Sequence, residues 1–152
     1  MNFCLNRDTK LYHLKEPVFD KKKVPAEAYI TCLNPGDYMA IQPIFSNDFS
    51  RLLFVGRREG FISHTANFQL MMLKWPPSEG QPSDIVIDTF KRYPSSEDSF
   101  SGLYGYHSSF GTMNFIGDSN RFAVFESQFK ESTRIYAVDL DAKEVQWLNF
   151  LK

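Results

Sequence analysis

The residues best able to form a serine-hydrolase site lie in one aromatic stretch. His107 and Ser108 are adjacent, within the run Gly-Tyr-His-Ser-Ser-Phe-Gly at 105–111. A nucleophile elbow requires Gly-x-Ser-x-Gly at a sharp turn from a strand into a helix, because small neighbours let the serine protrude. That spacing does not occur here. Adjacent residues of an extended segment also point to opposite faces, so the imidazole would not reach the hydroxyl. We predict no catalytic residue, and no enzymatic activity of the chain on its own.

Histidine and cysteine, the usual metal ligands, are scattered along the sequence. His13, His64 and His107 share no metal-ligand spacing, and two cysteines form neither a zinc motif nor a disulfide framework. We expect His13 to be a half-buried packing residue inside a strand and His64 to be exposed in a long loop. Cys4 and Cys32 are expected to be free and buried. No metal site and no cofactor site is predicted.

Two acidic pairs could in principle support general acid–base chemistry. They are Glu97 with Asp98, and Asp139 with Asp141. The carboxylates of a glycosidase act on opposite sides of a bound sugar, so they need a cleft and one raised pKa. Nothing in the sequence places either pair in a cleft, and neither is predicted to be catalytic.

Other acidic residues and glycines fit turns better than ligand sites. Asp48 and Asp118 occupy matching positions between apolar runs, where an aspartate side chain bonds local backbone N–H groups. Gly36, Gly80 and Gly117 are interpreted as turn glycines, because no glycine-rich loop opens a helix to form a phosphate cradle.

Charge and hydropathy exclude several classes of protein. The 152 residues carry 17 Lys+Arg and 18 Asp+Glu, with a formal net charge of −1, so no basic face for nucleic acid is expected. The basic run at 21–23 is interpreted as a solvated loop. No apolar stretch approaches the roughly 20 residues that span a bilayer, and polar residues at 6–10 interrupt any signal-peptide core. We expect a cytoplasmic protein that binds neither nucleic acid nor membrane.

The hydrophobic pattern is that of short strands separated by turns. Compact β-favouring runs such as 51–55, 121–126 and 134–139 are bounded by Pro, Gly, Asn and Asp clusters, and no sustained helical stripe occurs. The predicted strands lie near 10–15, 28–33, 39–44, 51–56, 68–74, 84–89, 109–115, 121–127, 133–139 and 144–150. The sequence therefore predicts an all-β protein.

Internal repeats favour a β-propeller. The motif Phe-x-x-Asp-x-x-Arg begins at Phe45 and again at Phe115, and both copies lead into an apolar strand. A second element at 10–15 recurs at 69–74 and 134–139. Four strands per unit in meander order is the pattern of a propeller blade. A β-sandwich with chance similarity is the alternative.

The order and spacing of these segments resemble a known family. Asn2-Phe3-Cys4-Leu5-Asn6-Arg7, Phe45-Ser46-Asn47-Asp48, the stretch 69–75, Ser99-Phe100-Ser101-Gly102-Leu103-Tyr104 and the tail 118–139 resemble the N-terminal propeller of acylaminoacyl-peptidases, of the prolyl oligopeptidase class. The likeness keeps one register from residue 2 to about 150. It implies a propeller that caps an α/β-hydrolase domain and restricts access to short N-acylated peptides.

We therefore expect a partial β-propeller of about two and a half four-stranded antiparallel blades: a partial blade at 1–36 and blades at 37–90 and 100–152, with no catalytic α/β-hydrolase domain. The resemblance makes it a non-catalytic, gating part of a serine peptidase, whose partners are the remaining blades and the hydrolase domain, in cis or in trans. The alternative is a stand-alone β-rich interaction module. An incomplete ring leaves a blade face open at each end, and we expect Leu11, Tyr12, Phe122 and Phe125 to be exposed there.

Overall fold

The computed structural model describes residues 9–14, 30–37, 39–58, 67–78, 80–89, 100–104 and 114–150, and within them it contains strands and turns but no helix. The strands are β1 (Tyr12–Leu14), β2 (Ile30–Cys32), β3 (Met39–Phe45), β4 (Arg51–Arg57), β5 (Asn67–Lys74), β6 (Asp84–Ile87), β7 (Leu103–Tyr104), β8 (Asn114–Ile116), β9 (Phe122–Phe129), β10 (Ser132–Asp139) and β11 (Glu144–Trp147). The all-β prediction is confirmed. All ten predicted strands overlap an observed one, and β7 was not predicted.

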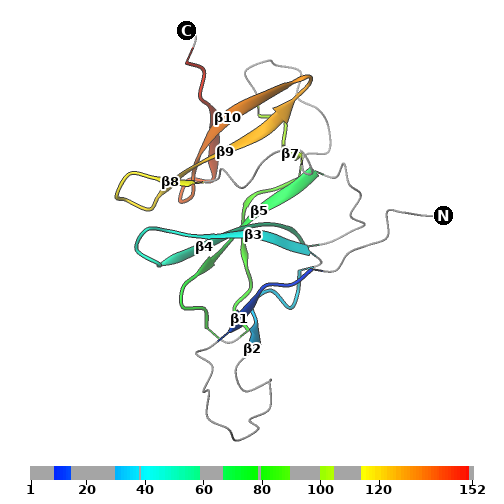
Figure 1. The fold of residues 1–152 in the computed structure, drawn as a ribbon, viewed down its shortest axis with the longest axis vertical. Coiled ribbons are helices and arrows are strands. Elements are labelled where there is room, and N and C mark those ends of the chain that lie inside the picture. Colours follow the sequence, from blue (N-terminus) through cyan, green and yellow to red (C-terminus); the bar gives the residue numbers. More distant parts are fainter. Residues whose placement is uncertain are drawn as a thin grey trace, which may run out of the picture.

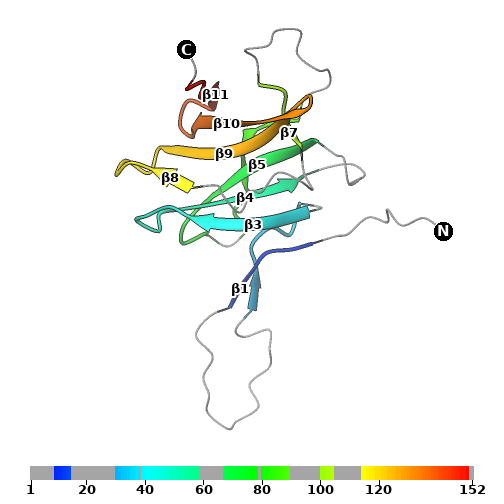
Figure 2. The ribbon, with the colours of Figure 1, turned by 45° about the horizontal axis from the view of Figure 1, so that its top comes forward.

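Three groups of antiparallel strands organise the molecule (Figure 1). We call β1–β2 the N-terminal pair, β3–β6 the first blade and β8–β11 the second blade. Each blade is a meander whose neighbours in sequence are neighbours in the sheet. Figure 2 shows the second blade lying above the first, with β1 projecting from the other side. The chain is thus an open, partial β-propeller.

Two apolar clusters cover the two faces of the first blade. The cluster shared with the second blade contains Leu53, Val55, Phe68, Leu70, Val86, Ile87, Leu103, Ala123, Phe125, Tyr136, Val138 and Leu140. The cluster on the opposite face contains Leu33, Ala40, Leu52, Phe54, Met71 and Leu73, with Leu11, Trp75 and Ile85 packed against it. The side chains of β4 therefore point alternately into one cluster and the other, and all five from Leu52 to Gly56 are buried.

The backbone hydrogen bonds show which face of the first blade meets the second. Ser46 N donates to Arg51 O at 2.9 Å, so Arg51 bonds toward β3. Hydrogen-bond direction and side-chain direction both alternate along a strand. Leu53 and Val55 therefore also bond toward β3, and their side chains form the cluster shared with the second blade.

The second blade uses its opposite face. Leu140 N donates to Arg121 O at 2.9 Å, so Arg121 and, by alternation, Ala123 and Phe125 bond toward β10. Ala123 and Phe125 lie in the shared cluster. Opposite faces meet when successive blades are related by rotation about a common axis, whereas a sandwich of equivalent faces would bury the same face of both sheets. This packing is that of a propeller.

The repeat in the sequence and the repeat in the structure differ by one residue at the first hairpin of each blade. Phe45 pairs with Leu52 in the first blade, but Phe115 pairs with Ala123 in the second. The second hairpin is therefore one residue longer, and the arginine that ends the motif does not occupy the same place in the two sheets. Because a one-residue slip moves a side chain to the other face, the motifs match Leu53 with Ala123 although these two residues lie on opposite faces of their blades.

The short strand β7 joins the two blades. Its residues pair with β5 through Asn67↔Tyr104 and Phe68↔Leu103. On the other side Ser127 Oγ of β9 donates to the Gly102 carbonyl at 2.8 Å. The segment noted above for its family resemblance thus forms bonds to both sheets at once.

Gly102 gives a direct test of this junction. Its φ is +111°, and a Cβ there would lie 2.8 Å from Asn67 Oδ1. We expect Gly102→Ala to lower the free energy of unfolding by about 1–3 kcal/mol, because the backbone would be strained and Asn67 would have to move. The measurement is urea denaturation at low protein concentration. The control is Gly36→Ala, where nothing lies within 4 Å of the new Cβ; equal midpoints for the two variants would contradict the role of Gly102.

Candidate functional site

Several residues considered above for chemistry lie outside the described residues. They are Cys4, the run at 21–23, His64, Glu97, Asp98, His107 and Ser108. The predictions about their roles remain predictions.

His13 and Cys32 lie in the N-terminal pair. The half-buried His13 ring packs edge-on against Trp75, with centroids 4.9 Å apart, which confirms the packing role. Cys32 is free as expected but only half-buried, so the prediction of burial is wrong. It pairs with Tyr12, which is 60% exposed, because no described sheet covers that side of the two strands.

Asp139 and Asp141 form ion pairs. Arg121 Nε donates to Asp139 Oδ1 and Oδ2 at 2.9 and 3.0 Å, and Arg121 Nη2 also contacts this carboxylate. The hydrogen bonds from Arg121 hold the pKa of Asp139 well below its usual range, and the N–H groups of Asp141 and Ala142 lower it further. A general acid needs the opposite shift. The carboxylate therefore organises the turn between β10 and β11.

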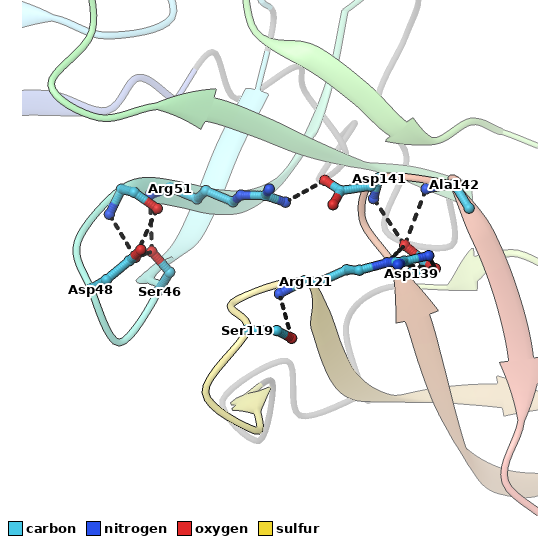
Figure 3. A network of polar contacts seen from close by, with 9 residues as sticks. Ser46, Asp48, Arg51, Ser119, Arg121, Asp139, Asp141 and Ala142 are labelled. Atoms are coloured by element: carbon cyan, nitrogen blue, oxygen red, sulfur yellow. Dashed lines mark hydrogen bonds and ion pairs between the residues drawn. The ribbon is translucent and has the colours of Figure 1, made fainter.

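Asp48 confirms its expected role in the first hairpin. Its Oδ1 accepts a hydrogen bond from Ser46 Oγ at 2.7 Å; both residues are labelled in Figure 3. It also accepts from Ser50 N at 2.9 Å and from Ser50 Oγ at 2.7 Å. Led by the bond from Ser46, these donors lower the pKa of Asp48 from 3.8 to about 2. The described contact of Asp118 runs instead through its backbone carbonyl, which accepts from Asn120 Nδ2 at 3.4 Å.

Polar contacts at one end of the two blades join them across the seam, by which we mean the boundary between β3–β6 and β8–β11. Arg51 Nη1 forms an ion pair with Asp141 Oδ1 at 2.8 Å, visible in Figure 3. The backbone N–H of Asn47 donates to Asn120 Oδ1 at 2.9 Å.

A second ion pair crosses the same seam. Lys143 Nζ contacts Asp84 Oδ1 at 2.8 Å. Lys143 and Asp141 both belong to the turn between β10 and β11, so one turn brings an acid and a base to the first blade. Such exposed pairs contribute only about 0–1 kcal/mol each, so the apolar cluster supplies most of the affinity and the ion pairs fix the register.

A buried polar cluster was not predicted from the sequence. The Asp37 side chain is only 4% exposed; its Oδ2 accepts from Ser83 Oγ at 2.8 Å and its Oδ1 from Arg58 Nε at 3.4 Å. Arg58 Nη2 also donates to Ser83 Oγ at 3.1 Å. Its members are far apart in the sequence, and only the Asn-Pro-Gly-Asp turn marked Asp37 as locally structured. The cluster is internally satisfied and ties the start of β3 to the loops after β4 and before β6.

No metal-binding group of three or more His, Cys, Asp or Glu side chains occurs among the residues that the structure describes. In the same residues no helix is long and apolar enough to cross a membrane.

The remaining candidates for function are two sheet faces that no described sheet covers. Tyr12, Leu14 and Ile30 are 60%, 61% and 42% exposed on the N-terminal pair. On the far side of the second blade, which we call the outer face, lie Ile116, Phe122, Val124, Ile135 and Ala137. Both are partly exposed apolar surfaces.

The expected exposed residues are half right. Tyr12 and Phe122 are exposed, but Phe125 is 1% exposed, and Leu11 packs against the cluster on the first blade. The reason is the two-residue period of a strand: Phe122 and Phe125 point to opposite faces of β9. The prediction for Phe125 and Leu11 is wrong.

Meander blades that meet through opposite faces and leave a face open at each end define a segment of a β-propeller. Comparison with protein families identifies which one. The model for the acylamino-acid-releasing enzyme, N-terminal domain, matches residues 1–150. The chain belongs to this family. No curated protein matches the chain significantly.

The hairpin carboxylate predicts a pH effect. Because the folded-state pKa of Asp48 is lowered, its contribution to stability is present above pH 4 and is lost as the pH falls toward 2. We expect the stability difference between wild type and Asp48→Asn to shrink over this interval. Ser50→Ala, which removes one donor, should raise the pKa of Asp48, as followed by its carboxyl chemical shift. An unchanged titration would contradict the assigned cause.

The outer face predicts self-association. Large apolar side chains left in water each forfeit roughly 1.5–3 kcal/mol of burial, so the isolated chain should associate or melt at low temperature. We expect Ile135→Ser, on the outer face, to shift the chain toward monomer in sedimentation experiments. Phe49→Ser removes a side chain that is 64% exposed in a hairpin away from that face, and it serves as the control. Equal effects of the two variants would argue against a specific face.

Proposed function

We propose that these residues are a non-catalytic part of the N-terminal propeller of an acylaminoacyl-peptidase-like serine peptidase. Their role is to restrict access of N-acylated peptides to a hydrolase domain that lies outside residues 1–152. The observation that carries the proposal is the family match over residues 1–150.

The packing supports a scaffolding role. The first blade buries side chains on both faces, Leu53 and Val55 on one and Phe54 on the other, all 0% exposed. The second blade has one covered and one open face, and no residue of the N-terminal pair is buried. A propeller protects its sheets by closing the ring, so the open faces suit the remaining blades of the same enzyme, in cis or in trans.

The charged groups support a structural role as well. Asp139, Asp141 and Asp48 are engaged in ion pairs or turn hydrogen bonds, and where the pKa is shifted, in Asp48 and Asp139, it is lowered. Carboxylates held ionised in this way fix turns and are poor proton donors at neutral pH.

The first test is catalytic. We expect the purified 152-residue chain to show no turnover of an acetylated alanyl chromogenic substrate. Turnover at enzyme-like rates, abolished by a serine-directed fluorophosphonate, would overturn the non-catalytic role.

The second test concerns gating in the complete polypeptide that contains residues 1–152. We expect it to hydrolyse short acetylated peptides in preference to long ones. Arg51→Gln removes an ion pair of the seam and keeps the apolar cluster, so it should reduce that size preference without abolishing turnover. Phe49→Ser is the control. An unchanged preference in Arg51→Gln and in the more severe Val55→Asp would contradict gating by these blades, and a complete polypeptide that is a stable, inactive monomer would favour a stand-alone interaction module.

A further inference from the structure

The outer face of the second blade corresponds, position by position, to the face of the first blade that packs against the second blade. Aligned through their hydrogen-bonding direction, Val124 stands where Leu53 does, because both bond toward the preceding strand of their blade. In the next strand Ala137 pairs with Val124 as Met72 pairs with Leu53, and two residues earlier in each strand Ile135 matches Leu70.

The two faces differ in what covers them. Leu53 and Leu70 are 0% and 1% exposed because the second blade packs on them, whereas Ile135 is 40% exposed. Ile116 and Phe122, paired with each other across β8 and β9, are 40% and 37% exposed on the same face. This face continues the established packing by one more step, and a third sheet docked in the same way would cover it.

The charged group at the rim of the outer face has a counterpart in the seam. Arg51 stands at the rim of the first blade and is met by Asp141 from the β10–β11 turn of the next blade. Phe122 takes the position of Arg51 in the second blade, and the Arg121 guanidinium lies over the Phe122 ring, 5.1 Å from its centroid. Because the hairpin is one residue longer, Arg121 is displaced by one residue from the position of Arg51. Its guanidinium nevertheless lies at the corresponding place on the rim.

We propose, on the basis of the proposed function, that the outer face docks a further four-stranded blade. The third hairpin of that blade brings an acidic side chain to Arg121, as the β10–β11 turn brings Asp141 to Arg51. The Arg121 side chain is 46% exposed beside Asp139, so it is accessible to a second carboxylate from outside. The sheet that docks is apolar at its centre, to cover Phe122 and Ile135, and it meets the carboxylate of Glu126, which stands where the fully buried Val55 does. The second blade meets the first through both Asp141 and Lys143, whereas the docking blade is defined by one acidic side chain and an apolar centre.

The acidic contact is tested by zero-length carbodiimide cross-linking in the complete polypeptide. In R121K the new amine should be joined to an acidic residue outside 1–152. R51K should be joined to Asp141, and the native Lys143 to Asp84, which serve as positive controls because those pairs lie within the described seam. If R121K is joined to Asp139 alone while both controls succeed, the acidic contact is wrong.

The docking itself has a separate readout. I135D should lower the thermal midpoint of the complete polypeptide by more than it lowers that of the 152-residue chain, because only the former covers the face. K74Q, an exposed change at the end of β5, is the control. Equal shifts in both polypeptides, or a natural product of 152 residues that is monomeric with and without I135D, would overturn docking. Loss of docking with peptide-size preference retained would remove this inference and leave the gating role standing.

Discussion

The constraint on which this structure depends is that a blade with apolar side chains on both sides must be covered on both sides. In β4, successive residues from Leu52 to Val55 are buried, which no sheet with one solvent face permits. The first blade meets the constraint because the second blade packs on one face, while Leu11 and Leu33, which flank the N-terminal pair, pack on the other. The second blade alternates buried and accessible residues along β9, the pattern of a sheet covered on one side. The difference between these patterns reflects which faces of the two blades the described residues cover.

Polar contacts add direction to this apolar stack. Apolar faces of similar size could slide or invert at small cost, since burial is not directional. The contacts of Asn47, Arg51 and Asp84 with the second blade all involve its hairpins at one end, so they allow one register and one orientation. The segment 102–104, which contains β7 and lies between the two blades in sequence, also fixes their relative position, because it has hydrogen-bond partners on β5 and β9. Weak exposed interactions thus select among arrangements that hydrophobic burial alone leaves close in energy.

The sequence predicted the strands well because the local signals were strong. Runs such as 51–55 and 134–139 combine β-branched and aromatic residues with turn residues on both sides, and the structure places strands there. The turn role of Asp48 was also readable, since its neighbours Ser46 and Ser50 supply the donors. The sequence did not show which face of the sheet each residue of β9 occupies. One extra residue in the second hairpin decides whether Phe122 or Phe125 is buried, and no local preference encodes it.

The same limit explains why the long-range polar groups were missed. Arg58 meets Asp37 and Ser83, at separations of 21 and 25 residues, only after β3, β4 and β6 have taken their places in the sheet. Asp141 meets Arg51 only when two blades are stacked. Contacts of this kind are consequences of the stack, and they in turn fix it. In the proposed gating role, access is restricted by the closed ring and not by any single blade, so the residues that matter most to that role are those at the seams, where each blade packs against the next.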